Sequence, residues 1–209
     1  FKKETFLYEA LEGKVVVPEL IAVDTSKNLI DKYYMIYRKI EGEPLASHWH
    51  ELTDEQRKEL IKQFCEQLKL IATFDRDQYA EVCRVEPNLD WQQHHLTELS
   101  KWQAIVTEKQ LFNTVKLRAI NEFIERYQRV LKPQQLAVTY WDVHFDNVLV
   151  DDNMKFVGLI DFESVDIASI DYTLATVRRM VQEPHRYLSL EMEPLAKKAD
   201  YERLMEWYQ

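Results

Sequence analysis

Three polar residues in one short stretch have the types and spacing of a metal-assisted active site. Asp142 precedes Asn147 by five positions, and Asp161 follows Asn147 by fourteen. Between Asn147 and Asp161 lie two brief apolar runs joined by the polar segment 151–153, a pattern typical of a β-hairpin. Because a hairpin returns the chain to its starting point, we expect Asn147 and Asp161 to lie close together.

These residue types predict magnesium binding and phosphoryl transfer. Mg²⁺ prefers oxygen ligands, which the Asp161 carboxylate and the Asn147 amide carbonyl can supply. Phosphoryl transfer needs Mg²⁺ on the nucleotide phosphates and one carboxylate that orients the acceptor hydroxyl. We therefore expect Asn147 and Asp161 to be metal ligands. Asp142 is then the catalytic residue that accepts a hydrogen bond from the attacking hydroxyl.

The residues before position 42 predict a small unit of one helix and an antiparallel sheet. Apolar residues recur at helical spacing over residues 2–12, and Gly13 is expected to end that helix. Three short runs rich in β-branched and aromatic residues then predict strands. These runs are Val15–Val17, Leu20–Val23 and Tyr33–Ile40.

The rest of the chain is predicted to be mostly helical, with strands only around the polar residues. Helices are expected from Thr53 or Asp54, over Asp90–Val106, over 107–131, and after Asp171 through Leu174, Val177, Val181 and Leu195–Trp207. The strand-like runs are Leu136–Thr139, Val148–Val150 and Phe156–Ile160. The first helix carries an apolar stripe expected in the core: Leu60, Ile61, Phe64, Cys65, Leu68 and Ile71.

The order of these elements predicts an α+β chain of two unequal parts. Residues 1–41 form the small helix-and-sheet part, and residues 42–209 form the larger helical part, interrupted by the hairpin that carries the acids. Ligand sites favour the interfaces between domains. We therefore expect a cleft between the two parts.

Composition and charge favour a globular protein that binds a small molecule. Of the 209 residues, 46% are hydrophobic, which is enough for a core. The formal charge of −9 argues against nucleic acid as a partner. It suits a cationic substrate, but acids that keep a protein soluble are the more common reason for such a charge. The longest apolar run, Tyr33–Tyr37, is far shorter than the ~20 residues that span a membrane. Two cysteines without CxxC spacing predict a cytoplasmic location.

The pattern from Asp142 to Glu163 resembles that of the aminoglycoside phosphotransferase and choline kinase-like family, which shares the protein-kinase fold. The kinase motifs D-x-x-x-x-N and D-F-G are similar to Asp142–Asn147 and Asp161–Glu163. The resemblance implies a two-lobed α+β fold with a small, sheet-containing N-lobe and a mostly helical C-lobe. Glu163 replaces the glycine, which favours a small-molecule kinase over a protein kinase. The resemblance extends over essentially all 209 residues.

The same resemblance implies a nucleotide site for ATP or GTP as phosphate donor. It places Glu4 on the small-lobe helix, where the family's glutamate pairs with the lysine that holds the nucleotide. It places three residues at the edge of the base: Arg38, Lys39 and Ile40. Leu149 and Ile160 would form the apolar floor under the ring. The family's glycine loop and lysine precede the Glu4 helix, so we expect them upstream of Phe1.

Candidate acceptor-binding residues flank the two motifs. Trp141 adjoins Asp142 and is expected either to face the acceptor or to pack within the fold. His144 is expected either to touch the transferred phosphate or to hold the loop. Three acids are expected either to bind substrate amines or to cap the next helix: Glu163, Asp166 and Asp171. The implied partner is a small-molecule hydroxyl acceptor, with a cationic one favoured by these acids.

One departure from the family pattern leaves a second function open. The family usually has His-Gly before the catalytic aspartate, whereas this chain has Tyr140-Trp141. The main expectation is a small-molecule kinase that transfers the γ-phosphate to a hydroxyl. The alternative is a non-catalytic nucleotide-binding or scaffold protein with a degenerate kinase site.

Overall fold

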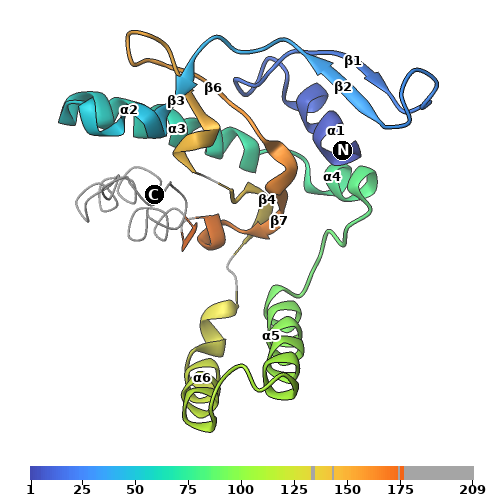
Figure 1. Cartoon of the computed structure of the whole chain (residues 1–209), viewed down its shortest axis with the longest axis vertical. Helices are drawn as coiled ribbons and strands as arrows, with labels where there is room; N and C mark the ends of the chain where they lie inside the picture. Colours follow the sequence, from blue (N-terminus) through green and yellow to red (C-terminus); the bar gives the residue numbers. More distant parts are fainter. Residues whose placement is uncertain (133–134, 143, 174, 177–209) are drawn as a thin grey trace. The chain divides into compact units, whose positions relative to one another are not determined.

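The computed structural model describes residues 1–132, 135–142, 144–173 and 175–176 (Figure 1). The chain divides into two compact units, one formed by residues 1–85 together with the chain from Ala137 onward, the other by Glu86–Leu136. We describe each unit by itself. The helices expected at Leu174, Val177, Val181 and Leu195–Trp207 lie outside the described residues. The division into parts 1–41 and 42–209 stays a prediction.

The described residues of the two units form helices, short strands and 3₁₀ turns. The helices are α1 (Lys2–Leu11), α2 (Leu45–His48), α3 (Asp54–Ala72), α4 (Arg76–Cys83), α5 (Trp91–Glu108) and α6 (Thr114–Tyr127). The strands are β1 (Leu20–Asp24), β2 (Tyr34–Tyr37), β3 (Glu43–Pro44), β4 (Leu136–Tyr140), β5 (Val148–Val150), β6 (Phe156–Leu159) and β7 (Val165–Ser169). Short 3₁₀ turns are η1 (Trp49–Glu51), η2 (Gln128–Leu131), η3 (Phe145–Asn147) and η4 (Phe162–Ser164). The expected mixture of helices and small sheets is confirmed.

The N-terminal helix and the strands that follow it match the sequence expectation except in one run. Helix α1 ends before Gly13, whose φ of 72° is a left-handed conformation that favours glycine. Strands β1 and β2 pair antiparallel, as expected. The strand expected at Val15–Val17 is wrong. The Val16 carbonyl accepts one bond from Leu159, but the Val16 N–H is taken by the Gln67 side chain, so no ladder continues.

Helix α3 begins and packs as its sequence predicts. The Thr53 side chain accepts from the Gln56 N–H while the Gln56 side chain accepts from the Thr53 N–H, which is a complete capping box. All six residues of the predicted apolar stripe are buried. The charged residues of the same helix are exposed or half-buried, which is typical of an amphipathic helix.

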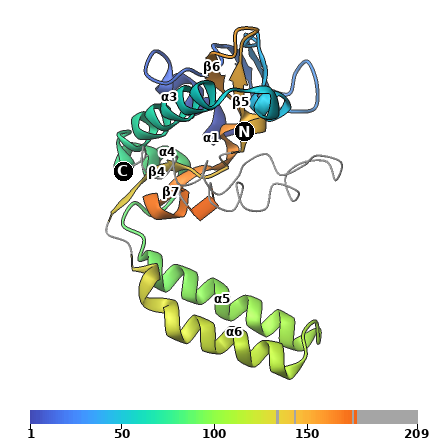
Figure 2. The ribbon, with the colours of Figure 1, turned by 90° about the vertical axis from the view of Figure 1, so that its left-hand side faces the viewer.

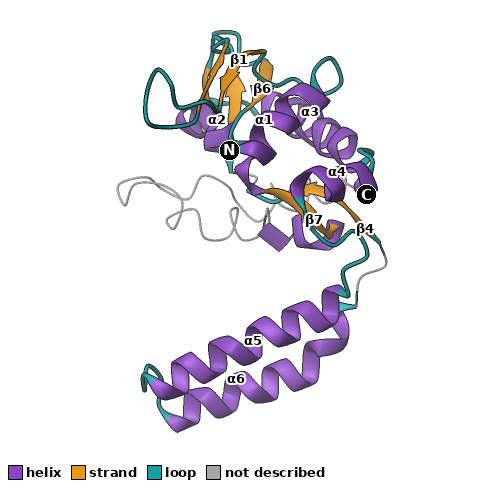
Figure 3. Cartoon of the chain, turned by 90° about the vertical axis from the view of Figure 1, so that its right-hand side faces the viewer, coloured by secondary structure: helices purple, strands orange, loops and turns teal. Residues whose placement is uncertain are grey.

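A three-stranded sheet in the order β3-β5-β6 supports the polar residues (Figures 1 and 3). The β5–β6 hairpin is the one expected from the sequence, and its strands pair antiparallel. Strand β3 is too short for the sequence pattern to reveal. It reaches β5 because Gly42 has no side chain: a Cβ there would lie 2.8 Å from the Val150 carbonyl oxygen and 2.8 Å from Val157 Cγ2.

The second unit is a helical hairpin of α5 and α6, which lie side by side (Figure 2). Helix α5 is the one expected over Asp90–Val106, and Asp90 caps it by accepting from the Gln93 N–H. The helix expected over 107–131 instead begins at Thr114, because the Asn113 side chain accepts from the Lys116 N–H and starts a new helix. The Gln103 amide donates to Asn121 at 2.7 Å across the hairpin.

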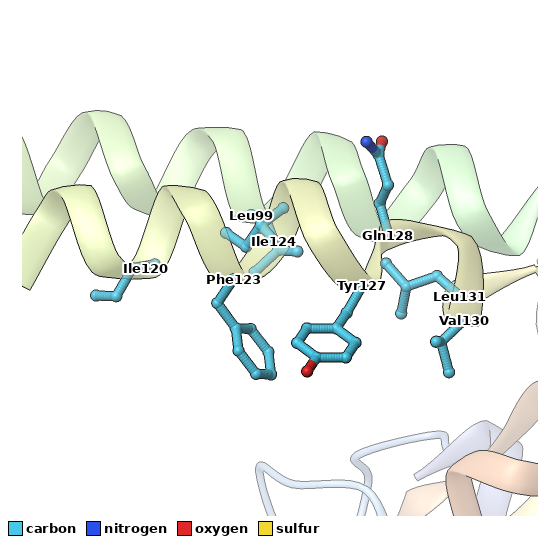
Figure 4. Close-up of a pocket in the computed structure, with 8 residues that line it drawn as sticks. All are labelled: Leu99, Ile120, Phe123, Ile124, Tyr127, Gln128, Val130 and Leu131. Atoms are coloured by element: carbon cyan, nitrogen blue, oxygen red, sulfur yellow. The ribbon is translucent and has the colours of Figure 1, made fainter.

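Aromatic and aliphatic side chains line a pocket of about 500 Å³ on this hairpin (Figure 4). Phe123 and Tyr127 project from α6 next to each other, and their ring centroids are 4.7 Å apart. The pocket residues are Leu99, Ile120, Phe123, Ile124, Tyr127, Gln128, Val130 and Leu131. None of the residues expected to bind nucleotide, metal or acceptor lines this pocket.

We expect Gly42→Ala to destabilise the protein by about 1–3 kcal/mol, the usual cost of overpacking. The new methyl group would meet the backbone of β5, which cannot move without disturbing the β5–β6 pairing. Gly13→Asn is the matched control, since nothing lies within 4 Å of a Cβ at Gly13 and asparagine tolerates its left-handed φ. Urea unfolding of both variants measures the difference. Equal losses would show that the close approach at Gly42 is unimportant.

Candidate active site

The loop that carries Asp142 is anchored at both ends by buried aromatic residues. It leaves β4 at Tyr140 and enters η3 at Phe145, whose ring centroid lies 4.5 Å from that of the fully buried Trp49. The Trp141 N–H donates to the Ser164 carbonyl at 3.3 Å. These contacts fix where the loop begins and where it ends.

Asp142 is half-buried and held by a neighbouring histidine. His144 Nε2 lies 2.5 Å from Asp142 Oδ1, and both side chains keep about a quarter of their surface exposed, 24% for His144 and 22% for Asp142. A carboxylate held at one oxygen and open at its edge can accept a hydrogen bond from an incoming hydroxyl. The contact supports the loop-holding reading of His144, while contact with a phosphate stays a prediction.

The Asn147 side chain is oriented by a hydrogen bond from its amide nitrogen. It donates to the backbone carbonyl of Asp142 at 3.1 Å. Burial raises the pKa of Tyr140 well above its ordinary value, and the neighbouring Asn147 side chain partly opposes that rise. With its nitrogen held in this way, the amide has its Oδ1 carbonyl oxygen as the acceptor atom that a cation could use.

The hairpin returns the chain to Asn147 at the residue before Asp161. The Ile160 N–H donates to the Asn147 carbonyl at 3.0 Å, which joins the end of β6 to η3. Asp161 itself has φ 64° and ψ 70°, a left-handed conformation that is uncommon for a residue with a side chain. Among the described residues, no group of three or more His, Cys, Asp or Glu could hold a metal. A carboxylate and an amide oxygen, completed by nucleotide phosphates and water, still suit Mg²⁺.

Glu4 faces the same region from α1. Burial raises the pKa of Glu4 above its ordinary value, and the negative charges of Asp161 and Glu163 raise it further. The Tyr8 hydroxyl donates to Glu4 Oε1 at 3.4 Å and partly opposes the rise. Three carboxyl groups thus share one electrostatic environment, which a nearby cation would stabilise.

The expected base-binding residues separate into two groups. Ile40, Leu149 and Gly158 meet: Leu149 pairs with Gly158 across β5 and β6, and a Cβ on Gly158 would lie 2.5 Å from Ile40 Cδ1. Ile160 follows β6 and is half-buried. Arg38 instead binds Glu19, with Nε 2.7 Å from Oε2, and Lys39 lies 3.9 Å from Glu41, both with exposed side chains. Three of the expected residues are therefore buried or half-buried: Ile40, Leu149 and Ile160. The other two, Arg38 and Lys39, make ion pairs at the surface.

The candidate acceptor residues occupy different environments. Trp141 is half-buried and its ring centroid lies 6.1 Å from that of Tyr172, edge to face. Glu163 and Asp171 are exposed. The Asp166 carboxylate accepts a hydrogen bond from the N–H of Ile167, the next residue of β7, at 2.8 Å.

Sequence reasoning missed two tyrosines of the site, Tyr8 and Tyr140. Both are buried, and both rings pack on Phe162: Tyr140 is stacked on it at 5.2 Å, and Tyr8 meets it edge to face at 5.6 Å. Tyr140 was noticed only as a departure from the family pattern. The position of Tyr8, one helical turn after Glu4, was the signal that could have found it.

Comparisons with known proteins identify the family and the fold. A family model described as "phosphotransferase enzyme family" matches residues 2–207. A streptomycin–ATP complex of APH(2″)-IIa and a GDP complex of aminoglycoside 2′-phosphotransferase-IIIa are similar in structure, with TM-scores of 0.71 and 0.70. Each is 18% identical, the matches cover 100% and 99% of this chain, and each covers 65% of the solved chain. A thermostable APH(4)-Ia mutant has a TM-score of 0.63 at 14% identity, over 100% of this chain and 73% of the solved chain.

Two curated relatives from Aspergillus fumigatus match a shorter region. Both are subtelomeric hrmA-associated cluster proteins, 33% identical over 79 residues, and the match covers 37% of this chain. It spans 15% of the length of each relative. Within the described residues, the helices are too short or too polar to cross a membrane.

The raised pKa of Glu4 predicts a pH dependence of stability. Because the folded-state pKa lies above the unfolded value of 4.5, the folded protein holds this proton more tightly, and stability falls as pH rises from 4.5 through the raised pKa. We expect Glu4→Gln to make this fall shallower when urea unfolding is measured from pH 4.5 to neutral. Glu9→Gln, on an exposed position of α1, is the control. An unchanged slope in Glu4→Gln would contradict the electrostatic account.

Proposed function

The chain belongs to the phosphotransferase enzyme family, and we propose that it transfers the γ-phosphate of ATP or GTP to a hydroxyl group of a small molecule. The observation that carries this proposal is the arrangement around Asn147. The side-chain amide nitrogen of Asn147 donates to the backbone carbonyl of Asp142. The backbone carbonyl of Asn147 accepts from the N–H of Ile160, the residue before Asp161. One residue therefore links the candidate base to the candidate metal carboxylate.

Asp142 positions the acceptor and takes its proton. The acceptor hydroxyl donates a hydrogen bond to the open edge of the carboxylate, while His144 holds Oδ1. As the hydroxyl oxygen forms a bond to the γ-phosphorus, the bond from that phosphorus to the bridging β–γ oxygen breaks. The proton passes to Asp142, and the nucleoside diphosphate leaves with the bridging oxygen.

Asn147 and Asp161 would hold Mg²⁺ through Oδ1 and the carboxylate. When bound, the ion neutralises charge on the phosphate oxygens. The residues themselves keep the ligand atoms in place: the Asn147 amide cannot rotate without losing its hydrogen bond to the Asp142 carbonyl, and Asp161 follows the end of β6.

The adenine or guanine ring would lie against Ile40, Leu149 and Ile160. These three side chains come from the segment after β2, from β5 and from the end of β6, and they supply an apolar floor for a flat ring. The backbone at Arg38 and Lys39 would lie at the edge of the base. Glu4 would bind the family's lysine. Structural neighbours in complex with ATP and with GDP leave the donor open between ATP and GTP.

The acceptor is proposed to be a small, cationic molecule that carries a hydroxyl. Glu163 and Asp171 are exposed carboxylates close in sequence to Asp161, and Trp141 offers an aromatic face beside Asp142. Cations are attracted by carboxylates and by aromatic faces alike. Neighbours solved with gentamicin and with streptomycin are consistent with such an acceptor. Asp166 and His144 would contact the edge of the bound acceptor.

We expect Asp142→Asn to lower kcat by at least about a hundredfold while nucleotide binding is retained, because the variant keeps its shape and loses the proton acceptor. Turnover is measured as nucleoside diphosphate release with a panel of cationic hydroxyl compounds on the full-length protein. Asp146→Asn, on the same loop, is the control. Undiminished turnover in Asp142→Asn would refute the role of this carboxylate.

We expect nucleotide to raise the melting temperature only when Mg²⁺ is present, since a ligand that binds only the folded state stabilises it. Asp161→Ala should abolish this dependence, whereas Asp152→Ala, in the exposed β5–β6 turn, should retain it. Binding of nucleotide without Mg²⁺ and without turnover would instead favour the degenerate, non-catalytic scaffold.

A further inference from the structure

The segment 43–49, which we call the brace, runs alongside the loop that carries Asp142. Its first part is β3, which pairs antiparallel with β5. Helix α2 follows and packs against η3 and β5. The brace ends at Trp49, which is fully buried and whose ring centroid lies 4.5 Å from that of Phe145. Because Phe145 lies between Asp142 and Asn147 in the chain, the brace meets the loop at its centre.

Arg57 of α3 contacts Trp49 in two different ways. Its Nε and Nη2 both donate to the Trp49 backbone carbonyl, at 3.1 and 2.9 Å. Its guanidinium carbon also lies 5.3 Å from the centroid of the Trp49 ring, which is within the range of a cation–π contact. The third nitrogen, Nη1, lies 3.6 Å from Asp54 Oδ1, and only 17% of the Arg57 side chain is exposed. Backbone and ring of one residue are therefore held by a single, largely buried cation.

The Trp49 ring needs this support because its own polar atom does not orient it. The indole Nε1 is buried and has no hydrogen-bond partner within the part of the chain that the structure describes. A buried tryptophan N–H usually finds a partner, and that bond fixes the direction of the ring. The orientation of Trp49 depends instead on packing, including its contact with Phe145, and on the Arg57 guanidinium.

A displacement of Phe145 would move two candidate site residues together. The Asn147 N–H donates to the His144 carbonyl at 3.0 Å, and the Asn147 side-chain amide donates to the Asp142 carbonyl at 3.1 Å. These two bonds close the loop around Phe145, whose side chain is buried. A ring that shifts within the loop therefore disturbs both bonds, and with them the candidate base.

We propose that Arg57 is a positioning residue that holds Trp49 against Phe145 and thereby keeps Asp142 in place for the transfer. This inference rests on the proposed function, in which Asp142 takes the proton of the acceptor. Arg57 acts through Trp49 and is not assigned to the acceptor, the nucleotide or the metal. An arginine suits the role because its flat guanidinium can lie over a ring and donate from two nitrogens to one carbonyl, which a lysine ammonium cannot do.

Removing the guanidinium should lower turnover without weakening nucleotide binding. In Arg57→Met the aliphatic part of the side chain remains, and we expect kcat to fall roughly tenfold, because even a small misplacement of a reacting group is costly. The KM for nucleotide should stay close to that of the unaltered protein, since the proposed base-binding residues lie outside this chain of contacts. Arg57→Lys keeps the charge and should resemble Arg57→Met. Full activity in Arg57→Lys, or a KM that rises as much as kcat falls, would overturn the proposal.

Two variants of the same helix separate positioning from loss of charge and from loss of stability. Lys62→Met removes an exposed cation of α3 and should leave kcat unchanged. Ile71→Val removes one methyl group from a fully buried side chain of α3 and should lower the melting temperature by an amount similar to Arg57→Met. It should also leave kcat unchanged. If Ile71→Val reduces kcat as much as Arg57→Met does, the effect is one of general stability and the positioning role is refuted.

A double-mutant cycle tests whether Arg57 acts through the ring of the loop. Phe145→Leu should lower kcat by itself, because the contact with Trp49 is lost. If the two residues act in series, the variant with both Arg57→Met and Phe145→Leu should have a kcat close to that of the slower single variant. Losses that multiply would show that the two residues act independently, and the proposal would be wrong.

Amide hydrogen exchange on the full-length protein provides a readout that needs no turnover. Arg57→Met should speed exchange of the Asn147 N–H roughly fivefold, because the loop that holds its acceptor is loosened. The Leu159 N–H, which donates to the Val16 carbonyl, is the internal reference and should keep its rate. Equal changes at both amides, or none at Asn147, would overturn the role of Arg57 and leave the proposed function standing. If the unaltered protein has no turnover with any acceptor, the proposed function fails, and with it the positioning role in transfer, whatever the exchange rates.

Discussion

The antiparallel pairing of β5 with β6 is the constraint on which the candidate site depends. It brings Asn147, just before β5, next to Ile160, just after β6, and their backbone groups are joined by a hydrogen bond of 3.0 Å. This bond places Asp161 one residue beyond the backbone contact with Asn147. Gly42 and Gly158 then allow neighbouring segments to approach the same sheet, because side chains there would collide with Val150 and Ile40.

Three carboxyl groups share one electrostatic environment around this hairpin. Glu4 comes from α1, while Asp161 and Glu163 flank Phe162, and their charges raise the pKa of Glu4 beyond the effect of burial. Asp142 is paired with His144. A cation near Glu4, Asp161 and Glu163 would relieve the repulsion among them.

Aromatic packing supplies the rigidity that these polar groups need. Phe162 is contacted by the rings of Tyr8 and Tyr140, and Phe145 packs on Trp49, so each end of the segment from Tyr140 to Phe162 is attached to the core. Buried aromatic rings contribute large apolar contact area, and the Tyr140 phenol adds a hydrogen bond to the Ile160 carbonyl. A strained residue such as Asp161 is stable in this setting because several independent contacts determine its conformation.

The sequence by itself determined the elements whose signals are local. Gly13 ends α1, Thr53 caps α3, and the alternation around 151–153 predicts the β5–β6 hairpin, because each depends on neighbouring residues only. The same hairpin pattern predicted that the chain returns toward Asn147 near Asp161. Only the tertiary structure decided that Val15–Val17 is not a strand, that β3 pairs with β5, and that the Tyr140 hydroxyl donates to the Ile160 carbonyl. These features join residues far apart in the chain, and no local pattern encodes which distant partner a hydrogen-bonding group will find.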